Sequence, residues 1–280
     1  MGTSMNTRVI KMKTITPMCS HGAEKEAELR LTEVKHAMRF WWRTINYYSD
    51  CDKLKQKERA LFGGLTNKSP LLLKPELDKE LHNVEITMKV RKSPKIKAIE
   101  SQTIKFGIMS DKHIDQYLNM LELISYLGGI GQRSRKGYGA FKILNQKTKI
   151  TNRNELLQRI KALINETGNQ SIKDSYGNNN YDINIDVPLW AKYPMVKKII
   201  IGNEINQKKQ VTSIFLDEVA SLVKKVNPIG ELEPYIYISC YESEKGNIIP
   251  ILTQLTYHKK VGLKKYLDYC REYISGFRSL

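Results

Sequence analysis

The strongest constraint on the fold is the order in which two kinds of apolar spacing follow each other as far as Leu144. Residues 7–16 alternate and are rich in valine, isoleucine and threonine, which is typical of a β-strand. From Thr32 onward, apolar residues recur three and four positions apart, which predicts an amphipathic helix. Similar patterns predict a short helix over 52–62, strands over 69–74 and 84–90, a helix over 111–127 and a strand over 140–144. Residues 91–104 are basic and poorly patterned, which fits a loop or a strand.

Leaving the short helix aside, this strand–helix–strand–strand–helix–strand order is that of a ferredoxin-like, or RRM-like, domain. The second half repeats parts of the order less clearly: it predicts helices over 151–166, 212–226 and 262–275 and strands over 196–201, 235–241 and 247–257. We therefore expect an α+β chain with two ferredoxin-like units in tandem. The first unit is expected over 5–168, with Met5 as the natural start, and a second, degenerate unit over 169–280.

The charge balance points to a polyanionic partner. The chain has 46 Lys and Arg against 29 Asp and Glu, a net charge of +17, and an excess of this size usually serves binding to nucleic acid. A membrane surface is the rival, but no apolar run approaches the roughly 18 residues that span a bilayer. The four cysteines are far apart and form no C-x-x-C pair, so we expect no structural zinc, no cofactor and reduced thiols in the cytoplasm.

A glycine-rich basic segment, residues 128–139, carries the sharpest functional pattern. It reads G-G-I-G-Q-R-S-R-K-G-Y-G, with five glycines and three cations. Glycine permits positive φ, free N–H groups in such a loop can bind an anion, and arginine grips phosphate with two hydrogen bonds. The segment is neither a P-loop, since no G-K-[ST] follows, nor a dinucleotide fingerprint, since it follows a helix and precedes a strand. A solvated basic turn is the alternative interpretation.

The first long helix carries aromatic residues between arginines, as Arg39-Phe40-Trp41-Trp42-Arg43. This composition suits single-stranded RNA, because each base stacked on a ring contributes roughly 1–3 kcal/mol while guanidinium groups take phosphates. Trp41 lies on the apolar stripe and is expected in the core, and its two aromatic neighbours can equally pack on the sheet or on another subunit. Lys35, Arg39 and Arg43 recur at four-residue steps on another face of the helix.

Both segments resemble those of RAMP proteins, the RRM-like subunits of CRISPR systems. The loop is similar to their C-terminal glycine-rich loop. The stretch Thr16-Pro17, Gly22-Ala23 and Glu28-Leu29-Arg30, followed by R-F-W-W-R, looks like the branch that forms the first-named RAMP subunit of type III-B (Cmr) effector complexes. The resemblance covers roughly Arg8 to Leu144. Gln132 and Lys136 depart from it, because the family often has more arginine in this loop.

This resemblance implies a subunit that binds guide RNA and single-stranded target RNA beside other RAMP subunits. It would lie near the guide's 3′ region, and target cutting is attributed to a different subunit of such complexes, so no catalytic residue is expected here. The resemblance implies RNA contacts at these positions: Arg30, Lys35, Arg39, Trp42, Arg43, Gly129, Gly131, Arg133, Ser134, Arg135, Lys136 and Gly137.

Two alternatives stay open. CRISPR guide-RNA-processing endoribonucleases have the same fold and often use a histidine, for which His21 and His36 are the candidates here. A general basic RNA-binding protein, such as a ribosomal protein, is the other alternative. No histidines stand at metal-ligand spacing and no carboxylates cluster, which disfavours a metal-dependent nuclease. The glycine-rich segment is not an RNP1 motif, so stacking of bases on the sheet is not expected.

Overall fold

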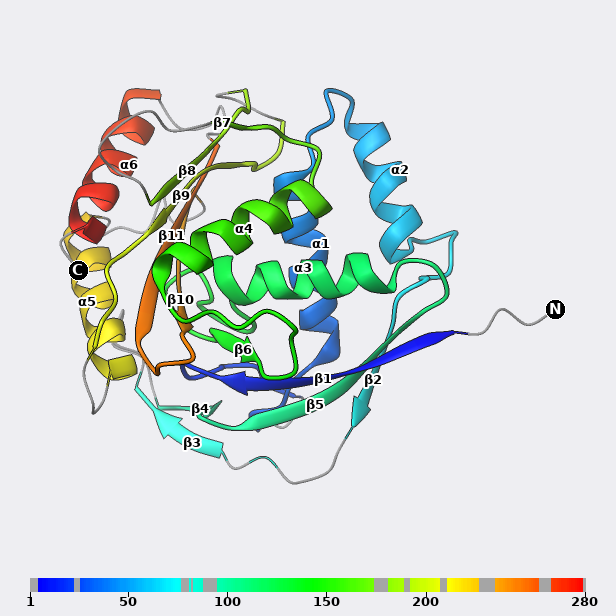
Figure 1. The fold of residues 1–280 in the computed structure, drawn as a ribbon, viewed down its shortest axis with the longest axis horizontal. Coiled ribbons are helices and arrows are strands. Elements are labelled where there is room, and N and C mark those ends of the chain that lie inside the picture. The colour runs from blue at the N-terminus through cyan, green and yellow to red at the C-terminus, as the bar shows by residue number, and fades with distance from the viewer. Residues whose placement is uncertain are drawn as a thin grey trace.

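The first unit of the chain forms a four-stranded antiparallel sheet with helices on one face (Figure 1). The computed structural model describes residues 5–22, 26–76, 81, 83–87, 95–173, 181–188, 192–206, 211–226, 235–256 and 263–278. The sheet consists of β1 (Asn6–Thr14), β2 (Leu72–Glu76), β5 (Thr103–Ser110) and β6 (Phe141–Ile143), in the order β2-β5-β1-β6. The two crossing helices are α1 (Leu31–Ile45) and α3 (Ile114–Leu127). First and last strands lie side by side, which is the ferredoxin-like order that the sequence predicts.

Alternation along β5 explains why the helices cover only one face. Ile104, Phe106 and Ile108 are buried in the same core as α1 and α3, while Lys105 points to the other face. The sequence patterns named a different strand as the third of this sheet, and that was wrong. The expected strand over 84–90 is β3 (Asn83–Ile86) as far as the described residues go, and it pairs with β4 (Ile96–Ile99) in a separate two-stranded sheet. Because Lys105 and Gly107 interrupt the apolar run of β5, they hid it from the pattern.

One helix is additional to the ferredoxin plan. This helix, α2 (Cys51–Phe62), stands between α1 and β2 and begins at Asp50, whose side chain accepts a hydrogen bond from the N–H of Asp52. It ends at Gly63, where φ is +77° and any Cβ would meet the backbone of Ser69. The short helix predicted over 52–62 is thus confirmed. In Figure 1 it lies beside α1, on the side of the molecule away from α5 and α6.

The second unit is a five-stranded antiparallel sheet in the order β10-β11-β9-β8-β7. Its elements, after α4 (Arg153–Thr167), are β7 (Ile172–Lys173), β8 (Asp182–Ile185), β9 (Val196–Ile201), α5 (Val211–Val226), β10 (Ile236–Glu242), β11 (Ile248–Leu255) and α6 (Leu263–Arg278). From β9 to α6 the order follows the ferredoxin plan. The neighbour of β9 is β8, which precedes it in the chain and takes the place that the last strand occupies in the first unit. This exchange is why the sequence shows a degenerate repeat, and the boundary at residue 168 stays a prediction.

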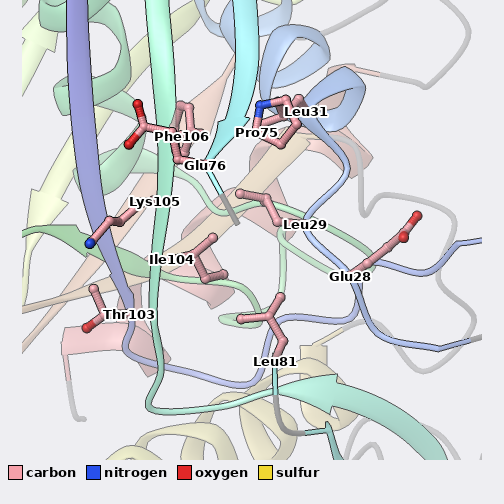
Figure 2. Close-up of a pocket in the computed structure, with 10 residues that line it drawn as sticks. All are labelled: Glu28, Leu29, Leu31, Pro75, Glu76, Leu81, Thr103, Ile104, Lys105 and Phe106. Atoms are coloured by element: carbon pink, nitrogen blue, oxygen red, sulfur yellow. The ribbon is translucent and has the colours of Figure 1, made fainter. Parts of the chain in front are cut away.

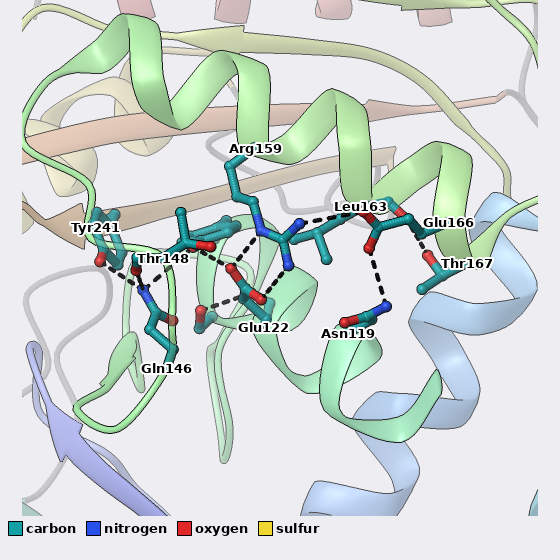
Figure 3. A network of polar contacts seen from close by, with 11 residues as sticks. Asn119, Glu122, Gln146, Thr148, Arg159, Leu163, Glu166, Thr167 and Tyr241 are labelled. Atoms are coloured by element: carbon teal, nitrogen blue, oxygen red, sulfur yellow. Dashed lines mark hydrogen bonds and ion pairs between the residues drawn. The ribbon is translucent and has the colours of Figure 1, made fainter. Parts of the chain in front are cut away.

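A buried polar network joins the two units (Figure 3). Glu122 of α3 accepts hydrogen bonds from Arg159 of α4, at 2.8 Å to Nε and 2.7 Å to Nη2. The Tyr126 hydroxyl also donates to Glu122, at 2.9 Å. The Gln146 amide donates to the hydroxyl groups of Tyr126 and of Tyr241, which belongs to β10. The sheet of the second unit is thereby fixed against α3, close to the start of the glycine-rich loop.

Candidate nucleic-acid interface

The glycine-rich loop, residues 128–139, is held by both units. On one side the Gln132 N–H donates to the carbonyl of Cys19 at 2.8 Å. On the other, the Gly137 N–H donates to the carbonyl of Ile238 at 2.9 Å, and the Ile238 N–H donates to the carbonyl of Arg135 at 3.0 Å. The loop therefore extends the sheet of the second unit alongside β10. Its shape depends on the docking of the two units and cannot form in the first unit alone.

The glycines of this loop serve packing within the protein. Gly137 has φ of +83°, and a Cβ there would lie 2.8 Å from the ring of Phe215 in α5. Gly139 has φ of +70° and a Cβ there would collide with the carbonyl of Ile130, so no other residue fits. Five loop N–H groups donate to carbonyls of the chain, those of residues 130, 132, 136, 137 and 139. The loop is therefore not an open anion nest of the kind the sequence suggested, and RNA contacts by Gly129, Gly131 and Gly137 stay predictions.

A groove of about 660 Å³ lies between the loop, α1 and β10, and we call it the loop groove. From α1 it is lined by Glu33, His36 and Phe40, from β10 by Tyr237, and from the loop by residues 129–136. Sequence reasoning expected the loop and α1 to contribute, and they do. It missed Tyr237, whose strand alternation marks an outward aromatic residue but says nothing about its distance from the loop.

Aromatic rings form one wall of the loop groove. The centroids of Phe40 and Tyr237 are 5.4 Å apart, and both lie within 5.5 Å of Trp41. Trp41 is 2% exposed and lies in the core, as expected. The guanidinium of Arg135 stands over the Tyr237 ring, 5.9 Å from its centroid, which is a cation–π contact. Burial raises the pKa of Tyr237 to about 12, with Arg135 acting against that rise, so its hydroxyl stays protonated at neutral pH.

The cations of the loop differ in access to solvent. Arg135 is exposed and Arg133 and Ser134 are half-buried, while Lys136 is 8% exposed. Arg133 has φ of +59°, in a tight turn closed by the Lys136 N–H on its carbonyl. Arg133 and Arg135 are therefore the loop cations that an RNA phosphate can reach most directly.

The basic residues of α1 face away from the loop. Arg39 Nε and Arg43 Nη1 each lie 2.6 Å from Oε1 of Glu58 on α2. Lys35 donates to the Ser69 hydroxyl at 2.7 Å. The single site expected from sequence is thus two surfaces on opposite flanks of α1, because the four-residue spacing of these cations turns them toward α2.

Two further predicted residues flank these surfaces. Trp42 is 3% exposed and packs against Phe62, with ring centroids 6.4 Å apart, so it offers no ring face for a base in this structure. Arg30 is exposed just before the first residue of α1. Their contacts with RNA stay predictions.

The histidines occupy different environments. His21 lies with Nε2 2.7 Å from the carbonyl of Lys97 and does not line the loop groove. His36 is exposed and does line it. Among the residues that the structure describes, no three His, Cys, Asp or Glu side chains are grouped to hold a metal ion. No helix within those ranges is both long and apolar enough to cross a membrane.

Two other surfaces suit RNA less well. The face of the first sheet opposite its helices carries Lys11, Lys74 and Lys105 but no aromatic ring in the paired strands, so it lacks the stacking platform of an RRM. A hollow of about 460 Å³ lies beside β2 and β5 (Figure 2). Its lining is largely apolar, with Glu28 and Glu76 among the residues around it.

Residues 11–142 match the family model of the RAMP superfamily. The match runs from β1 to β6 and includes α1 and the glycine-rich loop. This part of the chain is a RAMP-superfamily domain, which confirms the resemblance seen in the sequence.

Similar solved structures extend the likeness to nearly the whole chain. Cmr1 from Pyrococcus furiosus, in its apo form, superposes with a TM-score of 0.62 at 14% identity, covering 97% of each chain. A chain of the type III-B Cmr-beta structure bound to cognate target RNA and AMPPnP, in the presence of ssDNA, gives 0.56 at 14% identity, covering 95% of this chain and 98% of that one. A chain of Cmr-beta bound to cognate target RNA gives 0.54 at 13%, covering 98% and 99%. The chain thus has the fold of Cmr1. No curated protein is significantly similar to it in sequence.

Proposed function

We propose that this protein is an RNA-binding subunit of a type III-B CRISPR (Cmr) RNA-guided antiviral effector complex, and that single-stranded RNA lies in the loop groove. The RAMP-superfamily domain and the Cmr1-like fold support the assignment. The observation that carries it is the position of Arg135 over Tyr237 at the groove, beside Phe40. Cations next to ring faces are what single-stranded nucleic acid requires, since phosphates and bases are bound together.

In this proposal, phosphates contact Arg133 and Arg135 while bases pack against Phe40 and Tyr237. Specificity comes from pairing between guide and target RNA, because the groove offers few groups that could read base edges. The partners are guide RNA, target RNA and neighbouring RAMP subunits. The chain binds and helps to capture target RNA, and cleavage is left to another subunit.

The test is a salt titration of RNA binding. The double variant Arg133→Ala/Arg135→Ala should bind unrelated single-stranded RNAs more weakly and to the same degree for each. The slope of log K against log salt should fall by about 1.4, at about 0.7 per lost phosphate contact on a single strand. Lys147→Ala/Lys149→Ala removes the same charge at exposed positions outside the groove and serves as the control. Unchanged affinity in the arginine variant would remove the loop groove from the RNA site.

His36 in the loop groove favours one second candidate, a metal-independent endoribonuclease that processes guide RNA. The proposal expects labelled RNA to stay intact with the wild-type protein in EDTA. Cleavage that persists in EDTA and disappears in His21→Ala/His36→Ala would decide for the enzyme. His36→Ala alone separates the two histidines, because His21 is engaged by the Lys97 carbonyl.

A further inference from the structure

The additional helix α2 builds a second basic hollow on the flank of α1 that faces away from the loop groove. A hollow of about 460 Å³ is lined by Lys35, Arg39 and Arg59 and by the loop that follows α2. A neighbouring hollow of about 330 Å³ shares Arg59 and Asn67 with it. Together they make one elongated trough along α2, which we call the α2 trough. None of its lining residues lines the loop groove.

Cations outnumber carboxylates in and beside this trough. Glu58 is shared by Arg39 and Arg43, and Asp52 pairs with Lys55. In the described part of the chain, no carboxylate pairs with Lys35 or Arg59. Burial, and then the charge of Arg39, lower the pKa of Lys35, which shows that these cations are held near each other at a cost. An anion in the trough would remove that cost.

The shape and lining of the trough indicate which anion fits. It is open and elongated, which suits a chain that passes along it better than a small enclosed ion. The one aromatic ring in its lining, Phe62, is 2% exposed and offers no stacking face. Backbone phosphates, and not bases, match this lining, since arginine and lysine recognise phosphate irrespective of sequence.

We propose that the α2 trough binds the phosphodiester backbone of single-stranded RNA, at a second contact separate from the loop groove. This inference rests on the proposed function. Lys35 and His36 are adjacent in α1, and each lines a different surface, so one strand that crosses α1 touches both. The trough binds without sequence preference and adds length to the RNA path, on a helix that the ferredoxin plan does not require.

The experiment compares Arg59→Ser with Lys57→Ser in the full chain. Both remove one exposed lysine or arginine charge from α2, but Lys57 does not line the trough. Binding of a fluorescein-labelled single-stranded RNA of mixed sequence is measured across a salt series. Arg59→Ser should weaken binding several-fold and lower the salt slope by about 0.7, while Lys57→Ser leaves the slope unchanged. Lys35→Met should behave like Arg59→Ser, and thermal unfolding verifies that each variant is folded.

Failure of this inference is distinguishable from failure of the proposed function. If loop variants weaken RNA binding but Arg59→Ser and Lys35→Met do not, the trough is no RNA site and the loop groove stands. If the wild type shows no salt-dependent RNA binding, the proposed function itself fails. Loss of co-purifying subunits in Arg59→Ser with intact RNA binding would assign the trough to a protein contact. Stabilisation of the wild type alone by inorganic phosphate, with an unchanged RNA slope, would assign it to a free anion. Either of these two results overturns the proposal.

Discussion

The Oε1 atom of Glu58 lies 2.6 Å from the Nε atom of Arg39, so an acidic residue of α2 neutralises the cationic flank of α1. Arg43 binds the same oxygen at 2.6 Å. Glu58 is 6% exposed, whereas both arginine side chains are about one-third exposed. The carboxylate thus determines how much positive charge this flank presents to a ligand.

Glu58→Gln should therefore have opposite effects on stability and on RNA binding. Two charge-assisted hydrogen bonds weaken, which we expect to lower the free energy of unfolding by about 1–2 kcal/mol after allowing for the solvent around the arginines. RNA affinity should rise, because Arg39 and Arg43 lose their counter-ion. Urea unfolding and RNA anisotropy measure the two effects. Weaker RNA binding by a folded variant would mean that Glu58 positions these arginines for RNA and does not merely neutralise them.

The ring of Tyr237 should matter more than its hydroxyl. Tyr237→Phe keeps the wall of the loop groove and the contact with Arg135, so RNA affinity should stay near that of the wild type. Tyr237→Ala removes the ring and should cost about 1–3 kcal/mol in RNA binding, the usual contribution of one stacked base. Anisotropy on the same RNA measures both variants. Equal losses in the two would assign the effect to the hydroxyl.

The fold was largely predictable because it depends on local periodicity. Alternation and three-to-four spacing located the helices α1 to α5 to within a few residues, as well as the strands β9, β10 and β11. The third strand of the first sheet was missed because Lys105 and Gly107 on its outer face break the apolar signal. Only tertiary pairing with β1 reveals that strand.

The candidate site was predictable residue by residue but not as an arrangement. Spacing placed Arg39 and Arg43 on one flank of α1, yet nothing in the sequence shows that Glu58 would meet them there. The loop glycines were expected to approach a ligand, and the structure places Gly137 against Phe215 of the second unit. Tyr237 reaches the loop only because β10 pairs with it, a contact between segments far apart in the chain.

Thiol chemistry should separate Cys51 from the other three cysteines. Cys19, Cys240 and Cys270 are buried, and Cys51 is half-buried at the start of α2. Burial raises the pKa of Cys19 to about 12, against an opposing effect of Arg133, so its thiol stays protonated and unreactive near pH 8. An Ellman titration should therefore show one fast thiol, absent in Cys51→Ser, and three more on unfolding. Fast reaction of two thiols in the native protein would contradict this.

The same shift predicts a loss of stability in alkali. The ordinary pKa of a cysteine thiol, 9.0, applies to the unfolded chain, and the folded value for Cys19 is about 12. Between these values the folded state keeps a proton that the unfolded state releases, so the free energy of unfolding falls as pH rises above about 9. Urea unfolding at pH 8 and pH 10 measures the fall. Cys19→Ala should show a smaller fall than the wild type, and an equal fall would place its origin elsewhere.

The pair Glu122–Arg159 should be the most sensitive point for docking of the two units. Their side chains are 10% and 19% exposed, so removal of one partner leaves the other charged in a poorly solvated place. Arg159→Met should lower the free energy of unfolding by about 3 kcal/mol, at the lower end for a broken buried pair. Glu122→Gln/Arg159→Met should recover part of that loss, because no unpaired charge remains. Since Tyr126 and Gln146 carry the network on to Tyr241 of β10, the single variant should also loosen the loop that β10 holds. RNA binding by Arg159→Met should accordingly weaken at a site it does not touch, and unaltered affinity in a destabilised variant would show that the loop keeps its shape without this network.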